Sequence, residues 1–125
     1  MAESEKLSLT ATCQCKAVRI HFTRSTTDRP LNQCLCSICG RYAALWAYYE
    51  PSQVQIEGET DIYVRNKPAN EGKYLEFHRC KICGCVTHWA HPDKSVKKMG
   101  INCRMLDRPD LEKFEIKQED GPAPR

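Results

Sequence analysis

The stretch CLCSICG, which spans Cys34 to Gly40, places three thiols within six positions. It joins a C-x-C spacing to a C-x-x-C spacing through the shared Cys36, and both spacings are typical of metal ligands. Zinc takes four protein ligands where its role is structural, and three plus an exchangeable ligand where it is catalytic. The stretch therefore predicts three ligands of a zinc site whose chemistry depends on the fourth position.

Two further cysteine pairs predict a second metal site. Cys13 and Cys15 are expected on a strand, where residues two apart point to the same face. The sequence CKICG around Cys80 and Cys83 is typical of a zinc-knuckle turn, in which backbone N–H groups point at the sulfurs and Gly84 takes a positive φ. One pair from each segment makes a closed four-thiolate site, which indicates a structural zinc.

The fourth ligand of the Cys34–Cys39 stretch is not fixed by spacing. Cys85, Cys103, a histidine or no protein group are the alternatives. An open position favours a catalytic zinc, whereas closure by Cys85 would make both metals structural. An iron–sulfur cluster is also compatible with thiolate ligands.

Composition limits the remaining choices. The chain has 125 residues, enough for one domain of ordinary size, and a net charge of +3, which is too small to indicate nucleic-acid binding. Its beginning, MAESEKLSLT, lacks the pattern of a signal peptide, and no apolar run is long enough to span a membrane. Because the nine cysteines are odd in number and have ligand-like spacing, we expect bound metal in a reducing, cytoplasmic location rather than disulfides.

The pattern of apolar residues favours short strands over helices. We expect strands in the segments 6–15, 17–22, 44–50, 54–58, 61–66, 74–80, 86–91 and 97–103, with a turn-rich loop at 67–73. Segment 107–117 should hold one helical turn near Pro109 and then a last strand. The sequence thus predicts a mostly β domain over residues 1–117, with metal replacing part of the core, and a flexible tail over 118–125.

Four segments together resemble the glutathione-dependent formaldehyde-activating enzyme family, also called the centromere-protein-V-like domain. They are CQCKAVRI, CLCSICGRY, FHRCKICGC and GINCRMLDRPDL. The resemblance implies a β-tent fold of short strands organised around two zinc sites, one structural and one presumed reactive on Cys34, Cys36 and Cys39. It also implies a carbon–sulfur lyase of the S-(hydroxymethyl)glutathione synthase type, with a glutathione-like thiol as partner.

Neighbouring residues supply candidates for the remaining chemistry. A thiol held as thiolate can add to a small carbonyl, and the developing alkoxide then needs a proton. His88 and His91 are the main candidates for that proton donor, with Tyr42 a weaker one. Arg41 is a candidate for binding a substrate carboxylate. Aromatic residues that could line a pocket are Trp46, Tyr48 and Trp89.

Two other functions remain open at this stage. The first is a zinc-stabilised binding module without catalysis, in which both metals are structural. The second is nucleic-acid binding through the basic run KSVKK at residues 94–98, although such a run is more often a solvated loop. Serine variants of the ligands would separate an enzyme from a binding module.

Overall fold

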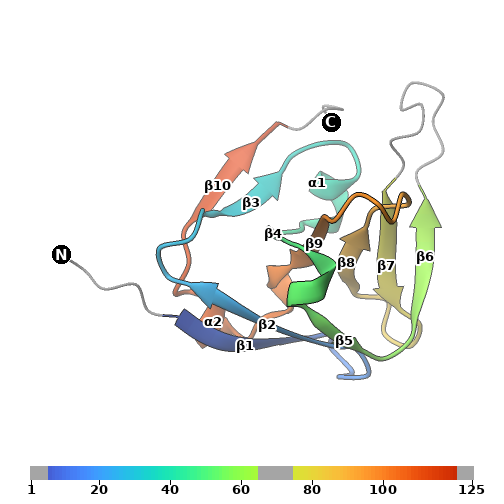
Figure 1. The fold of residues 1–125 in the computed structure, drawn as a ribbon, viewed down its shortest axis with the longest axis horizontal. Coiled ribbons are helices and arrows are strands. Elements are labelled where there is room, and N and C mark those ends of the chain that lie inside the picture. Colours follow the sequence, from blue (N-terminus) through green and yellow to red (C-terminus); the bar gives the residue numbers. More distant parts are fainter. Residues whose placement is uncertain (1–5, 65–74, 121–125) are drawn as a thin grey trace.

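The computed structural model describes residues 6–64 and 75–120, which form two β-sheets (Figure 1). A three-stranded sheet has the order β1-β2-β5, and a seven-stranded sheet has the order β10-β3-β4-β9-β8-β7-β6. The strands are β1 Lys6–Thr12, β2 Arg19–Ser25, β3 Leu31–Cys34, β4 Trp46–Tyr49, β5 Gln55–Glu57, β6 Thr60–Val64, β7 Glu76–Cys80, β8 Val86–Ala90, β9 Met99–Asn102 and β10 Ile116–Glu119. The helices are α1 Cys39–Tyr42 and α2 Arg108–Leu111, with short 3-10 turns at Pro51–Gln53 and Cys103–Met105.

The small sheet forms because β1 and β2 alternate strictly. Leu9 and Ala11 of β1 are buried, as are Ile20 and Phe22 of β2, while their neighbours along each strand are more exposed. Period-two alternation gives each strand one apolar face, which must pack against another layer. The two strands pair antiparallel over their whole length, and β5 adds to the other edge of β2.

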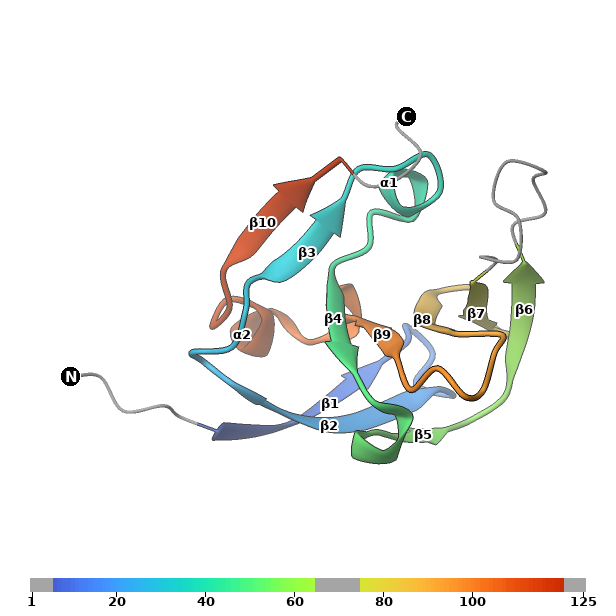
Figure 2. The same cartoon turned by 45° about the horizontal axis from the view of Figure 1, so that its top comes forward.

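The large sheet is antiparallel along β4-β9-β8-β7-β6, while β10 pairs with β3 in parallel. β3 and β4 share only the pair Asn32↔Trp46, so they separate beyond this point. Figure 2 shows β3 and β10 leaning away from the other strands of this sheet, with α1 above them. In the described part of the chain, the separation leaves the β3 side of β4 without a strand partner at residues 47–49.

The two faces of the large sheet belong to different apolar clusters. Ala47 and Ile101 face the small sheet and pack with Ile20 in the main core. Trp46, one residue before Ala47, belongs to a second cluster that contains the three cysteines of the Cys34–Cys39 stretch. The alternation of β4 therefore separates the core between the sheets from the outer face, where this cysteine stretch lies.

The mostly β prediction is confirmed, and so is the helical turn near Pro109, which is α2. The last strand extends to Glu119, so Gln118 and Glu119 lie in β10 rather than in the expected tail. β3 and α1 were not predicted. The predicted loop 67–73 lies outside the described residues. No helix in residues 6–64 or 75–120 is long and apolar enough to cross a membrane.

Candidate metal centres

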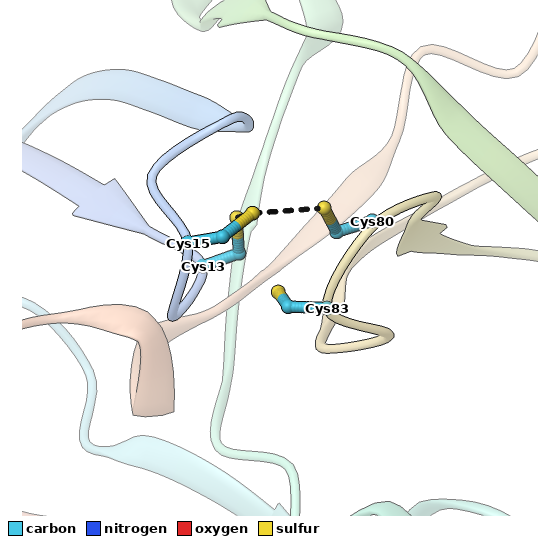
Figure 3. A group of neighbouring side chains, drawn as sticks. All are labelled: Cys13, Cys15, Cys80 and Cys83. Atoms are coloured by element: carbon cyan, nitrogen blue, oxygen red, sulfur yellow. Dashed lines mark hydrogen bonds between the residues drawn. The ribbon is translucent and has the colours of Figure 1, made fainter.

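Four cysteines converge between the two sheets, and we call them the four-cysteine group: Cys13, Cys15, Cys80 and Cys83. One pair comes from the β1–β2 turn, and the other from the end of β7 and the turn that follows it, so the group links the small sheet to the large one (Figure 3). The Cys15 sulfur lies 3.7 Å from that of Cys13 and 3.6 Å from that of Cys80. A tetrahedron with zinc–sulfur bonds of about 2.3 Å has sulfurs about 3.8 Å apart. The thiols are thus spaced as zinc ligands.

Backbone N–H groups support these sulfurs. Val18 N–H donates to the Cys13 sulfur at 3.3 Å, and Ile82 N–H donates to the Cys80 sulfur at 3.4 Å. Gly84 has the predicted positive φ of 80°. Hydrogen bonds from the backbone N–H groups of Cys85 and Cys15 lower the pKa of Cys83 to about 5. Such donors stabilise thiolates, which are the form that binds metal.

The structure corrects one detail of this group. Cys13 and Cys15 were expected on a strand, but β1 ends at Thr12 and both cysteines lie in the turn that follows. Lys16 has a φ of 66°, and its N–H donates to the Cys13 carbonyl at 3.0 Å. The two sulfurs come together because the chain turns tightly, and not because a strand alternates.

Three cysteines form a second, local set, which we call the trio: Cys34, Cys36 and Cys39. Cys34 ends β3, Cys36 forms an isolated bridge just before the turn, and Cys39 begins α1. The Cys39 N–H donates to the Cys36 sulfur at 3.3 Å, and the Gly40 N–H donates to the Cys36 carbonyl at 2.8 Å. The turn ends at Ala43, whose positive φ of 54° closes the short helix. Backbone geometry alone therefore holds the three thiols together.

The trio is more buried than an ordinary metal knuckle at the surface. Its side chains are 8%, 3% and 7% exposed in chain order. Burial raises the pKa of Cys34 and of Cys39 above the ordinary range. Burial opposes ionisation of Cys36 as well, but hydrogen bonds from the Cys39 backbone and from the neighbouring thiols lower the pKa of Cys36. Without a cation, one thiol of the three ionises most readily.

Aromatic rings from the outer face of the large sheet cover the trio. Trp46, Phe77 and Trp89 belong to its cluster, and the Trp89 indole lies so close over Gly100 that a Cβ there would be 2.1 Å from its nitrogen. Trp46 Nε1 is buried without a hydrogen-bond partner in the described residues, yet its N–H acts on Cys39 to lower that pKa. A buried donor beside a thiol fits a Cys39 thiolate as its acceptor.

Two tyrosines lie beside the aromatic rings of this cluster, Tyr42 packed against it and Tyr48 at its exposed border, 42% exposed. The Tyr42 ring packs on Phe77 with centroids 5.5 Å apart, and the Tyr48 ring lies 6.1 Å from that of Trp89. The Asn32 amide donates to the Tyr48 hydroxyl oxygen. Partial burial raises the pKa of Tyr48 against the lowering effect of the Asn32 hydrogen bond, and the charges of Cys34 and Cys39 add to the rise. Its O–H proton therefore stays in place at neutral pH. The sequence named Tyr48 only as a pocket residue, since nothing in it shows this placement.

His88 and His91 do not lie with the trio. His88 is the neighbour of Trp89 on β8 and points to the opposite face of the sheet, opposite Ile101. Its ring stacks on that of His78 with centroids 4.2 Å apart, and both rings line a cavity of about 320 Å³ together with His91. Burial lowers the pKa of His88 to about 3, so the imidazole is neutral. This placement gives no support to a role for either histidine beside the trio.

The remaining candidates also have defined positions. Cys85 belongs to neither cysteine set, and its thiol interacts with Cys83 and Cys13 rather than with the trio. Cys103 is fully buried in the main core. Arg41 is exposed on α1 and donates to the Ser37 carbonyl at 2.7 Å, which braces the trio loop. Within residues 6–64 and 75–120, the trio has no fourth Cys, His, Asp or Glu ligand.

Comparisons with known proteins agree with this arrangement. The sequence model of the family described as "Glutathione-dependent formaldehyde-activating enzyme" matches residues 8–119. The chain belongs to this family. A Rhodobacter sphaeroides protein of known crystal structure is similar in fold, with a TM-score of 0.62 and 22% sequence identity over 87% of this chain and 100% of that one. No curated protein matches the chain. The family is an enzyme family, and its match covers both cysteine sets.

Proposed function

We propose that this protein is a zinc-dependent carbon–sulfur lyase of the S-(hydroxymethyl)glutathione synthase type, with the trio as its reactive centre. One observation carries the proposal: three buried thiols lie within 4.8 Å of one another and lack a fourth protein ligand in the described part of the chain. Three protein ligands are the pattern of catalytic zinc, and four are the pattern of structural zinc. Membership of an enzyme family supports the same assignment.

Each residue of the centre has a distinct task. Cys34, Cys36 and Cys39 would hold the metal as thiolates. Bound zinc would favour the ionised form of these ligands and would also lower the pKa of a thiol substrate. The buried Trp46 N–H would donate to the Cys39 sulfur and help to compensate its charge. Phe77 and Trp89 pack in the same cluster as the thiols and would exclude water from this side of them. The four-cysteine group would hold a second, structural zinc.

The reaction that fits this centre is addition of a thiol to a small carbonyl, or its reverse. In the addition reaction, the thiol S–H bond breaks, a sulfur–carbon bond forms, and the carbonyl oxygen takes a proton to become a hydroxyl. We assign delivery of that proton to the Tyr48 hydroxyl. The Asn32 amide donates to a lone pair of the Tyr48 oxygen, which leaves the Tyr48 O–H free to donate to the substrate oxygen. The thiol releases its proton to solvent, and the Tyr48 oxygen takes a proton back from solvent, so that no net proton is gained or lost.

The proposed thiol is glutathione or a similar small thiol, and the electrophile is formaldehyde or a related carbonyl. All nine cysteines are free, which fits a reducing compartment such as the cytoplasm. The competing function is a binding module in which both metals are structural. Rate measurements separate the two functions.

The test uses zinc-loaded protein with glutathione and formaldehyde. Because this addition also proceeds without catalyst, the measured quantity is the exchange rate between free glutathione and its hydroxymethyl adduct, followed by NMR exchange spectroscopy. We expect the rate to rise in proportion to protein concentration, and to remain at the uncatalysed value with equimolar zinc alone. Metal analysis should give two zinc equivalents per chain. A folded protein with two zinc ions and no effect on the exchange of glutathione or other small thiols would favour the binding module.

A further inference from the structure

A cavity of about 700 Å³ opens where β3 and β4 separate, and neither cysteine set accounts for it. It is lined on one side by the β2–β3 connection and on the other by β4, with Lys98 at its border. Its volume is in the range of small-molecule sites. The residue that marks it as a binding site is Arg24, near the end of β2.

Arg24 is a buried cation without a carboxylate partner. Its side chain is 5% exposed because Arg24 continues the inward face of β2 after Ile20 and Phe22. One terminal nitrogen donates to the Tyr49 hydroxyl at 3.2 Å, and the other donates to the Arg29 carbonyl. The Nε is buried and has no hydrogen-bond partner, and no ion pair to Arg24 occurs among the described residues.

A charge buried in this way is costly unless an anion compensates it. The Tyr49 hydroxyl and the Arg29 carbonyl are neutral acceptors, and the Phe114 ring, 5.5 Å from the guanidinium carbon, is a further weak partner. None of these carries a full negative charge. The guanidinium therefore lacks a compensating anion, and its buried Nε–H is a donor without an acceptor among the described residues.

The rest of the cavity favours an anion as well. Three more basic side chains line it, Lys6, Arg29 and Lys98, against a single acidic one, Asp28. The Asp28 carboxylate already accepts the Ser25 N–H at 2.8 Å, which holds it in the β2–β3 turn. The excess of positive charge would attract an anionic ligand and raise its association rate.

We propose that this cavity binds a small carboxylic acid, with Arg24 as its anchor. A planar carboxylate fits the donors of a guanidinium better than it fits a point charge, and the aromatic rings of Tyr48 and Tyr49 provide an apolar wall for the ligand's carbon skeleton. This assignment does not depend on the lyase function.

The carboxylate could come from two sources, and the geometry connects one of them to the trio. Trp46 lines the cavity and also belongs to the trio's cluster, and Tyr48 lines the cavity while its ring contacts Trp89. A thiol substrate with a carboxylate arm would thus reach from the trio to Arg24, an interpretation that rests on the proposed function. The other source is a separate acid that occupies the cavity by itself.

The primary test is calorimetric titration of the zinc-loaded protein with succinate and, separately, with glutathione, at fixed ionic strength. We expect at least one of these ligands to bind, and Arg24→Met to weaken that binding by about tenfold or more, the value of one charge-assisted hydrogen bond. Arg19→Met is the matched control, because Arg19 lies on the exposed face of the same strand and bonds the Lys16 carbonyl. Binding that is absent in the wild type, or equal in Arg24→Met and the wild type, would overturn the proposal.

Two additions keep the test decisive. If Arg24→Met does not fold, Arg24→Lys retains a charge but removes the Nε donor, and the same loss of affinity is expected. Glutathione diethyl ester, which lacks free carboxylates, identifies the source. If the ester binds the wild type as weakly as glutathione binds Arg24→Met, the carboxylate belongs to the thiol substrate. If Arg24→Met weakens the binding of succinate but not that of glutathione, the site takes a separate acid. Because binding is measured without turnover, an inactive lyase would not affect this result.

Discussion

The two cysteine sets differ in how far apart their ligands lie along the chain. The four-cysteine group joins residues 65 positions apart, at the Cys15–Cys80 contact, and links one sheet to the other (Figure 3). The trio draws its ligands from one short stretch, the end of β3, the connection after it and the start of α1. A metal on the first set closes a long loop of the chain. A metal on the second set closes only a short loop, which backbone hydrogen bonds already hold together. A metal on the first set would therefore stabilise the fold, and under the proposed function the second set would be left for chemistry.

Electrostatics supports the same division. In the four-cysteine group, backbone N–H groups of Cys83 and Ile82 lower the pKa of Cys80, and Cys83 has a pKa of about 5. In the trio, burial raises the pKa of Cys34 and Cys39. The turns thus lower the pKa of two ligands in the first set, whereas the pKa of Cys15, despite a hydrogen bond from the Ala17 backbone, is raised to about 11 by burial and by the neighbouring thiols. In the trio only the pKa of Cys36 is lowered, so Cys34 and Cys39 depend on the metal to ionise.

The largest expected effect follows from breaking the four-cysteine group. Cys80→Ser removes a ligand that links the two sheets, and structural zinc contributes on the order of 10 kcal/mol in small domains, comparable with a whole domain's net stability of about 5–15 kcal/mol. We expect loss of the cooperative melting transition in circular dichroism, and release of at least one zinc. Cys85→Ser, outside both sets, is the control and should melt cooperatively. A normal transition in Cys80→Ser would refute the structural role.

Breaking the trio should instead abolish turnover in a folded protein. Cys39→Ser removes one of three ligands, and we expect about one zinc equivalent to be lost, catalysed adduct exchange to fall to the uncatalysed rate, and the melting temperature to change far less than in Cys80→Ser. Metal analysis, NMR exchange and calorimetry measure the three quantities. If Cys39→Ser unfolds as Cys80→Ser does, both metals are structural and the catalytic assignment fails.

A smaller effect is expected at Tyr48. Tyr48→Phe removes the proposed proton donor but keeps the ring that packs near Trp89. Proton transfer of this kind contributes about 10²–10⁴-fold, so we expect kcat to fall by about a hundredfold with both zinc ions retained. Tyr63→Phe, on exposed β6, is the matched control and should leave kcat unchanged. An unchanged kcat in Tyr48→Phe would show that solvent, or another group, protonates the oxygen.

Much of this arrangement could be predicted from the sequence because metal ligands and strands leave regular spacings. The cysteine sets follow from C-x-C and C-x-x-C, and most strands follow from alternation. β3 was missed because Leu31–Cys34 has only four residues, two of them the polar Asn32 and Gln33. α1 was missed since a single turn carries no helical period.

The partners of the trio could not be predicted for a different reason. Which face of a strand meets the trio depends on how the sheets pack, so Trp89 lies with the trio and its neighbour His88 does not. Arg24 and Tyr48 acquire their roles through contacts across the separation of β3 from β4, which no local pattern reports. Arg24 lies on the same face of β2 as Ile20 and Phe22. A charged residue at that position of the apolar pattern was the one sign in the sequence that Arg24 is buried.

The smallest expected effect concerns His88, on the side of the sheet away from the trio. Its pKa is lowered to about 3 from the ordinary 6.5, so the unfolded chain binds a proton that the folded protein excludes as pH falls below 6.5. His88 should therefore reduce the free energy of unfolding by up to about 1.4 kcal/mol per pH unit between pH 6.5 and about 3. His88→Gln removes this titration, and its unfolding curves in urea at pH 7, 6 and 5 should lose less stability than those of wild type. Because His88→Gln keeps every cysteine of both sets, the two proteins should release metal equally in acid, and the difference between their unfolding curves isolates the histidine. Parallel losses of stability would show that His88 becomes protonated without unfolding.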